Sequence, residues 1–133
     1  MRNGKAVVLV VEDDFLVRMG AVEIVLNAGY EVLEAGSADE AIQILTSRND
    51  IELVFTDVQM PGTMDGLELA RYIEIRWPNV NIIVTSGTLV LQTNTLPPGA
   101  GFFAKPYVDD TVTDEIALML SVSLLFGNQV SSL

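Results

Sequence analysis

Carboxylate, hydroxyl and ammonium side chains directly follow several apolar runs of this chain. Taken singly, each has an ordinary structural explanation as a helix cap, a turn residue or a solvated charge. If the fold brings them together, the carboxylates repel one another at a cost of roughly a few kcal/mol at short range. A hard cation would offset that repulsion, and Mg²⁺ prefers carboxylate, carbonyl and water oxygens. The residues are Glu12, Asp13 and Asp14, then Asp57, Ser86 and Lys105.

The composition restricts the chemistry that the chain can perform. Its 133 residues are 50% hydrophobic and 19% charged, which favours one folded domain over a disordered segment. The chain contains no cysteine and no histidine. This composition excludes disulfides, thiolate catalysis, zinc–thiolate sites and hydrolases of the Ser-His type. A metal site in this chain must therefore be built from oxygen ligands.

The charge and the apolar runs bear on partners and location. The chain has 7 Lys and Arg against 18 Asp and Glu, a formal net charge of −11. Such a charge repels phosphate backbones, so we expect no direct binding of nucleic acid. Acids follow the apolar run at residues 6–11 too early for a secretory segment, and residues 116–126 fall short of the ~20 that span a bilayer. We expect a cytoplasmic protein with no transmembrane helix.

Apolar runs alternate with segments of helical periodicity. The run at residues 6–11 is rich in β-branched residues, as in a central parallel strand buried on both faces. The alternation predicts an α/β fold with a doubly wound five-stranded parallel sheet. In such sheets ligands bind at the carboxyl ends of the strands, near the point where the strand order reverses. Strands are expected at residues 6–11, 30–35, 51–56, 80–85 and 100–104.

Capping and turn residues mark the expected helices. Residues 88–95 are rich in weak helix formers, so a helix there would be marginal and we expect this segment to be poorly ordered. The other helices carry clear start or stop signals. They are expected at residues 15–28 between Asp14 and Gly29, after the capping box at residues 37–40, from Asp65 to Trp77-Pro78, and from Asp109 or Asp110 to about Phe126.

Four segments resemble the receiver domains of bacterial two-component response regulators. The resemblance covers nearly the whole chain, and the order and spacing of the motifs make it specific. It implies the flavodoxin-like (CheY-like) form of the doubly wound fold and a single receiver domain over residues 1–133, with no output domain. The motifs are Leu9-Val10-Val11-Glu12-Asp13-Asp14, Asp57-Val58-Gln59-Met60-Pro61 followed by Asp65-Gly66, Thr85-Ser86-Gly87, and Lys105-Pro106.

The resemblance also implies how the acidic residues act. Asp57 is expected to be the phosphoacceptor, whose carboxylate attacks the phosphorus of a phosphohistidine on a partner protein. Asp13, Asp57 and the backbone carbonyl of Gln59 are expected to bind Mg²⁺ directly, and Glu12 is expected to act through water. Phosphoryl transfer needs mainly positioning and charge neutralisation, which agrees with the lack of a general base in the chain.

Further residues are expected to bind the phosphoryl group and to respond to it. Lys105 should pair with the phosphoryl oxygens as a compact charge, and Ser86 should donate its hydroxyl to the same group. Phe102 is the expected switch ring, and without a hydroxyl its movement would rest on packing alone. The family turn implies a cis bond before Pro106, although most X-Pro bonds are trans. The loop after Asp57 is one residue longer than the commonest family spacing.

Three other classes of protein share part of this pattern. A magnesium-dependent nuclease or primase of the Toprim kind needs Asp-x-Asp at the second acidic site, where this chain has Asp57-Val58-Gln59. A haloacid-dehalogenase-like phosphatase needs Asp-x-Asp at the first, where this chain has Glu12-Asp13-Asp14. A receiver-shaped module that is never phosphorylated typically loses the acceptor, the acids or the lysine, and this chain keeps all of them.

The expected partners are proteins: a histidine kinase or phosphotransfer protein as donor, and a downstream protein as target. The last helix predicts a further contact, because residues 116–126 contain two serines and no charge. A helix that is apolar on all sides must be covered on all sides. Either residues 127–133 or crystal neighbours cover it, or the helix ends early, or it is a surface for partner binding or self-association. In the last case we expect a second copy to pack there as a homodimer that buries roughly 1,200 Å² or more.

Overall fold

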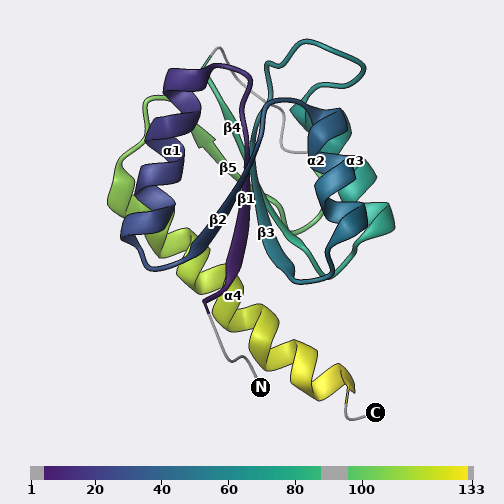
Figure 1. Ribbon diagram of the computed structural model, residues 1–133. Coiled ribbons are helices and arrows are strands. Elements are labelled where there is room, and N and C mark those ends of the chain that lie inside the picture. The colour runs from purple at the N-terminus through teal and green to yellow at the C-terminus, as the bar shows by residue number, and fades with distance from the viewer. Residues whose placement is uncertain (1–4, 88–95, 132–133) are drawn as a thin grey trace.

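The computed structural model describes residues 5–87 and 96–131, with side chains up to residue 122. Within these residues five parallel strands form one sheet in the order β2-β1-β3-β4-β5 (Figure 1). The prediction of a doubly wound parallel sheet is confirmed. The strands are β1 (Val7–Val11), β2 (Glu31–Ala35), β3 (Ile51–Asp57), β4 (Asn81–Ser86) and β5 (Gly101–Ala104).

The burial of each strand follows its place in the sheet. β1 lies between β2 and β3, and none of its residues is more than 4% exposed. Continuous apolar sequence suits such a strand because both of its faces are covered. β2 lies at the edge and carries Glu31 and Glu34, both exposed. The strand order reverses between β1 and β3, whose register pairs Val11 with Thr56, so the residues that follow lie side by side.

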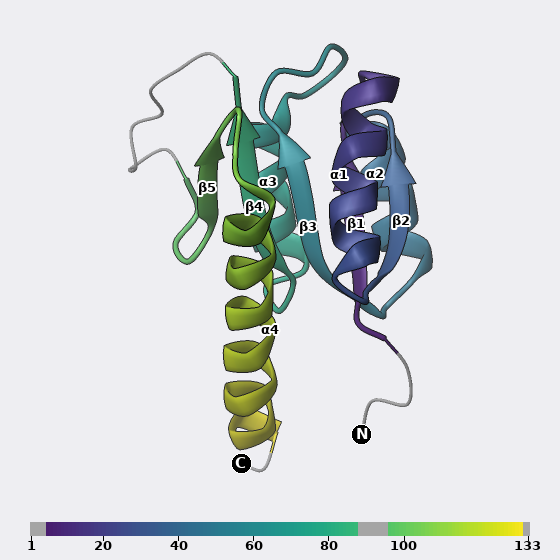
Figure 2. The ribbon, with the colours of Figure 1, turned by 90° about the vertical axis from the view of Figure 1, so that its left-hand side faces the viewer.

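Helices cover both faces of the sheet (Figures 1 and 2). α1 and α4 pack on one face, and α2 and α3 pack on the other. Asp14, Ser37 and Asp65 cap the first three helices by accepting hydrogen bonds from backbone N–H groups. Gly29 ends α1 with a φ of 98°, as its sequence position predicted. The helices are α1 (Phe15–Asn27), α2 (Ala38–Ser47), α3 (Gly66–Arg76) and α4 (Asp109–Ser131).

The sheet separates two hydrophobic cores. Alternate residues of β1 point to opposite faces, so Leu9 packs with α2 and α3 whereas Val10 packs with α1 and α4. Val112, Ile116 and Leu120 recur every fourth residue of α4 and are buried against the sheet. We call these three residues the α4 stripe.

The beginning of α3 packs tightly against the end of β3. A Cβ atom on Gly66 would lie 1.9 Å from the carbonyl oxygen of Asp57 and 2.8 Å from the Cα of Val58. Only glycine fits so close to another backbone. The N–H of Gly66 donates to the carbonyl of Val58 at 2.9 Å. This contact ties the start of α3 to the backbone that carries Asp57.

Two sequence predictions about the helices are wrong in part. α4 continues to Ser131 instead of ending at about Phe126, because residues 127–131 contain no proline and Gly127 only weakens a helix. Residues 127–131 therefore extend the helix instead of covering it, and α4 reaches beyond the amino ends of the strands (Figures 1 and 2). The capping box at Ser37 is incomplete, because Oε1 of Glu40 accepts from the N–H of Gly36.

Three further predictions concern the peptide bond before Pro106, membrane-spanning helices and the order of residues 88–95. The Lys105–Pro106 bond is cis, as the resemblance implied. Within the described residues no helix is long and apolar enough to cross a membrane. The poor order predicted for residues 88–95 concerns a segment outside the described residues.

Candidate functional site

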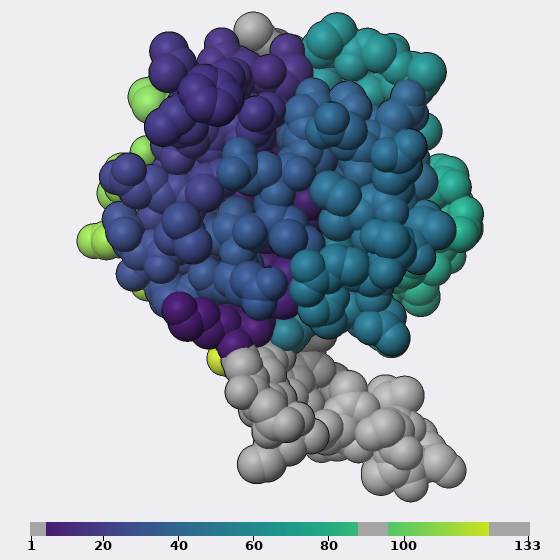
Figure 3. Space-filling model, in the orientation of Figure 1, coloured from purple at the N-terminus to yellow at the C-terminus, as the bar shows by residue number. Residues whose placement is uncertain are grey.

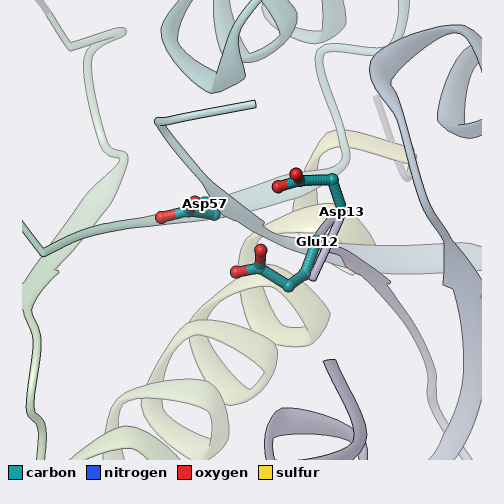
Figure 4. Close-up of side chains that lie close together, drawn as sticks. All are labelled: Glu12, Asp13 and Asp57. Atoms are coloured by element: carbon teal, nitrogen blue, oxygen red, sulfur yellow. The ribbon is translucent and has the colours of Figure 1, made fainter. Parts of the chain in front are cut away.

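The carboxyl ends of the strands bring the predicted polar residues to one edge of the sheet. Glu12 and Asp13 follow β1, and Asp57 is the last residue of β3. One carboxylate oxygen from each lies within 4.8 Å of the others (Figure 4). We call these three residues the acidic cluster. It lies where the strand order reverses, which is the position at which doubly wound sheets bind ligands.

Lys105, which follows β5, forms ion pairs with two members of the acidic cluster. Its Nζ lies 3.1 Å from Oε1 of Glu12 and 3.2 Å from Oδ1 of Asp57. The side chains of Glu12 and Asp57 are only 7% and 6% exposed, so this network is largely removed from water. Asp13, in contrast, is exposed. One ammonium group therefore faces two buried carboxyl groups.

Burial is the largest influence on the pKa of the two buried carboxyl groups. It raises the pKa of Asp57, although the charge of Lys105 opposes the shift. It also raises the pKa of Glu12, against the hydrogen bond from the backbone of Asp14. Burial alone would lower the pKa of Lys105, but its hydrogen bond to Glu12 and the charge of Asp57 raise it overall. Burial therefore disfavours the ionised forms of both carboxyl groups, and Lys105 only partly offsets this effect.

Oδ1 of Asp57 is a poorly satisfied atom of the site. It is buried, and within the described residues it accepts no hydrogen bond, although Nζ of Lys105 lies at ion-pair distance. A buried carboxylate oxygen without a hydrogen bond is costly. A divalent cation bound by the acidic cluster would satisfy it, and three carboxyl groups are the hard oxygen ligands that such ions prefer. The residues present therefore fit a divalent metal ion.

Asp14 has a structural role beside the acidic cluster. Its Oδ1 accepts hydrogen bonds from the N–H groups of Leu16 and Val17, at 3.0 and 3.1 Å. Its own N–H donates to Oε2 of Glu12 at 3.1 Å. The interpretation of Asp14 as a helix cap is confirmed. The residue begins α1 and at the same time fixes the carboxylate of Glu12.

The other predicted residues surround the acidic cluster. Ser86, buried at the end of β4, donates its hydroxyl to the side-chain oxygen of Gln59 at 3.0 Å, a contact that the sequence did not reveal. The phosphate-binding role of Ser86 and the metal-binding role of the Gln59 carbonyl stay predictions. Phe102 of β5 is half-buried against the core beneath α2 and α3, and its role as switch ring also stays a prediction. Lys105 enters the site directly before the cis-bonded Pro106.

Two further residues beside the site were missed from sequence. Tyr107 lines a small hollow together with Glu12, and burial raises its pKa. Arg18 donates to the carbonyl oxygen of Glu12 at 2.8 Å. Its position held a signal, because it is the only basic residue between Lys5 and Arg48 and follows the acidic run by one helical turn.

Comparison with known families agrees with this geometry. Residues 8–117 match the family described as the response regulator receiver domain. The chain therefore belongs to this family of two-component signalling domains, whose fold it shares.

Similar proteins include both large and small signalling proteins. The sensor kinase CckA of Brucella abortus is 38% identical over 109 residues, a match that covers 79% of this chain but only 11% of the kinase. Sporulation initiation phosphotransferase F of Bacillus subtilis is 29% identical, with 87% of this chain and 93% of the relative covered. The response regulator TrrA of Thermotoga maritima, solved with Mg²⁺ and BeF, is 26% identical with a TM-score of 0.74, over 85% of this chain and 97% of TrrA.

Proposed function

We propose that this chain accepts a phosphoryl group on Asp57 from a phosphohistidine and signals by changing conformation. The observation that carries the proposal is the buried Asp57 carboxyl group, 3.2 Å from the ammonium of Lys105 and beside two further acids. In the transfer a carboxylate oxygen of Asp57 attacks phosphorus. The new O–P bond forms as the P–N bond breaks, and the P–N electron pair leaves with the imidazole. No metabolite is turned over, and the chain acts as a signalling acceptor.

Mg²⁺ is the ion that we propose for the acidic cluster. Asp13 and Asp57 would bind it directly with the carbonyl of Gln59, and Glu12 would hold one of its waters. When bound, the ion supplies positive charge that neutralises the transferred phosphoryl group. The fit rests on the short separation of the three carboxyl groups and on the unsatisfied oxygen of Asp57.

Lys105 and Ser86 are proposed to recognise the attached phosphoryl group. The Nζ of Lys105 already lies beside Asp57 and can pair with a phosphoryl oxygen after a small movement. Ser86 would exchange its hydrogen bond with Gln59 for one with the phosphoryl group. Phe102, on the strand paired with β4, would follow the movement of Ser86.

The proposed donor is a histidine kinase or a phosphotransfer protein, and the output is a contact with a further protein. α1 begins beside the acidic cluster and exposes Phe15, Leu16 and Met19 by 60%, 76% and 51%. Its first turns, purple in Figure 3, form part of the surface at the upper end of the molecule. An exposed apolar patch beside an acceptor site suits a protein donor. Because such kinases take their phosphoryl group from ATP, we place the chain in the cytoplasm.

Labelling with a small phosphodonor tests the acceptor. With Mg²⁺ and acetyl phosphate or phosphoramidate, intact-mass spectra should show one added phosphoryl group on the wild type and none on Asp57→Asn. Slow loss of the group should follow removal of the donor. Undiminished labelling of Asp57→Asn would refute the assignment. Mg²⁺ at millimolar levels should also raise the melting temperature, because the ion binds the folded cluster and not the unfolded chain.

We further propose that a second copy of the chain packs against α4. Leu118 and Val122 are 59% and 44% exposed on the side of α4 that does not carry the α4 stripe. The helix also continues beyond the amino ends of the strands (Figure 2), which lengthens the element that a partner helix could contact. Sedimentation at micromolar concentration should show a dimer that Leu118→Ser weakens. If the chain sediments as a monomer both with and without beryllofluoride, which mimics the phosphoryl group, the proposed self-association would be rejected.

A further inference from the structure

Arg18 connects three elements at the edge of the acidic cluster. From the first turns of α1, its Nη1 donates to the carbonyl oxygen of Glu12 at 2.8 Å. Its Nε donates to Oε1 of Glu34 on β2 at 3.0 Å. The side chain of Arg18 is only 18% exposed, so the guanidinium is held in place and not extended into solvent.

The carbonyl that Arg18 holds belongs to the peptide between Glu12 and Asp13. Since a peptide unit is planar, its orientation helps to set the direction of the acidic side chains on either side. Other contacts hold the residues around it: the N–H of Glu12 donates to the carbonyl of Ala35 at 3.0 Å, and Oε2 of Glu12 accepts from the N–H of Asp14. Arg18 holds a further polar group of this segment, the carbonyl oxygen of Glu12.

The neighbouring loop after β2 leaves space for the guanidinium. A Cβ atom on Gly36 would lie 3.3 Å from Nη1 of Arg18, tighter than an ordinary contact. The N–H of Gly36 donates to Oε1 of Glu40, which keeps the loop in this position. Glu34 balances the charge of Arg18. The guanidinium therefore has a fitted place between α1 and β2.

We propose that Arg18 is a positioning residue for the acidic cluster, and that it maintains the affinity for Mg²⁺ by fixing the Glu12–Asp13 peptide. This inference rests on the proposed Mg²⁺ site. Arg18 cannot act by attracting the ion, because its own charge is positive. Its contribution is to hold Asp13, the exposed ligand, in place before the ion binds, so that less ordering is required on binding.

Charge and geometry predict opposite results for Arg18→Met. If Arg18 acted through its charge alone, its removal would tighten Mg²⁺ binding. If it positions the loop, its removal should raise the dissociation constant for Mg²⁺ by about tenfold or more. Titration calorimetry with MgCl2 measures this constant without any phosphodonor. Unchanged or tighter binding in Arg18→Met would overturn the proposal.

Three controls make the result specific. Arg76→Met removes an equal charge from the last turn of α3, where Arg76 contacts Tyr72 and Trp77, and should leave Mg²⁺ binding unchanged or slightly tighter. Melting curves in EDTA report whether Arg18→Met folds. If it does not, Arg18→Lys should fold and bind Mg²⁺ more weakly than the wild type, and wild-type affinity in that variant would overturn the proposal. Failure of the wild type itself to bind Mg²⁺ would instead reject the metal site.

Discussion

The two faces of the sheet bury similar kinds of core but differ in what their helices expose. Within the described side chains, α2 and α3 leave one large hydrophobic residue exposed, Ile75. α1 and α4 leave seven, although each also buries a stripe against the sheet. Exposed apolar side chains on one face favour contact with a partner protein there. They are Phe15, Leu16, Val17, Met19, Leu26, Leu118 and Val122.

The difference in exposed apolar residues suggests that both faces stabilise the fold, whereas the face with α1 and α4 also offers a surface for partner recognition. On the face with α2 and α3, Gly66 makes a close backbone contact with the end of β3. The face with α1 and α4 carries a core of its own and also a second, outward set of apolar residues. Substitutions on the two faces should therefore have different consequences.

The largest expected effect comes from Gly66→Ala. The added Cβ would meet backbone atoms of Asp57 and Val58 that cannot move away cheaply, so we expect a loss of about 3 kcal/mol or more in the free energy of unfolding. Urea denaturation measures this loss. Gly20→Ala on α1 is the matched control, because nothing lies within 4 Å of its added Cβ and alanine favours a helix by up to about 1 kcal/mol. Equal losses in the free energy of unfolding for Gly66→Ala and Gly20→Ala would contradict the expected difference between these two positions.

The next effect compares two residues of the same helix. Ile116 is fully buried and Leu118 is 59% exposed, so Ile116→Ala should cost about 2–5 kcal/mol whereas Leu118→Ala should stay within about 0.5 kcal/mol in the monomer. Denaturation at low concentration measures both variants. A large loss for Leu118→Ala under these conditions would show that its exposed surface is covered by the chain itself.

A smaller effect concerns the acidic cluster at the edge that both faces share. The pKa of Asp57 is raised above its ordinary value of 3.8, so the folded chain binds this proton more tightly than the unfolded chain. That stabilisation is complete below the ordinary pKa and is lost as the pH rises through the folded pKa. In EDTA near neutral pH, Asp57→Asn should therefore melt about 2–5 °C above the wild type. The difference in melting temperature between Asp57→Asn and the wild type should disappear toward pH ~4. If Asp57→Asn instead melts below the wild type at neutral pH, that result would contradict the raised pKa of Asp57.

The smallest effect on stability is expected for Leu16→Ser on α1. Leu16 is 76% exposed, so the melting temperature should change by no more than about 1–2 °C. Labelling by acetyl phosphate should be unchanged, while transfer from a phosphorylated histidine phosphotransfer protein should slow. Glu23→Ser, on the same helix, serves as a polar control. Equal transfer rates for all three proteins would argue against a contact through α1.

The fold and the acidic cluster could be predicted because local sequence determines them. A parallel strand buried on both faces, such as β1, reads as an unbroken apolar run, and the residue after it must lie at the carboxyl edge of the sheet. The sequence therefore predicts that Glu12, Asp13 and Asp57 lie together, as they do in the structure.

Contacts that depend on side-chain direction were not predictable in this way. The hydrogen bond from Ser86 to Gln59 depends on how the loop after β3 places the Gln59 side chain beside the end of β4. The contact of Arg18 with a backbone carbonyl leaves no trace in hydrophobic periodicity. The last helix was expected to end at about Phe126, where the apolar run stops, but α4 continues to Ser131, because a helix does not have to end where its apolar residues do.

The length of α4 gives the molecule a lever. The α4 stripe anchors the first half of the helix, and roughly 16 Å of helix follows Leu120 at about 1.5 Å per residue. A tilt of roughly 10° about Leu120 would swing the far tip by about 3 Å. Tyr107 lines a hollow with Asp57 and packs against the core that contains the α4 stripe. Because α4 also runs roughly 16 Å from its start at Asp109 to Leu120, a tilt that shifts its first turn would move the far tip by about the same distance in the opposite direction.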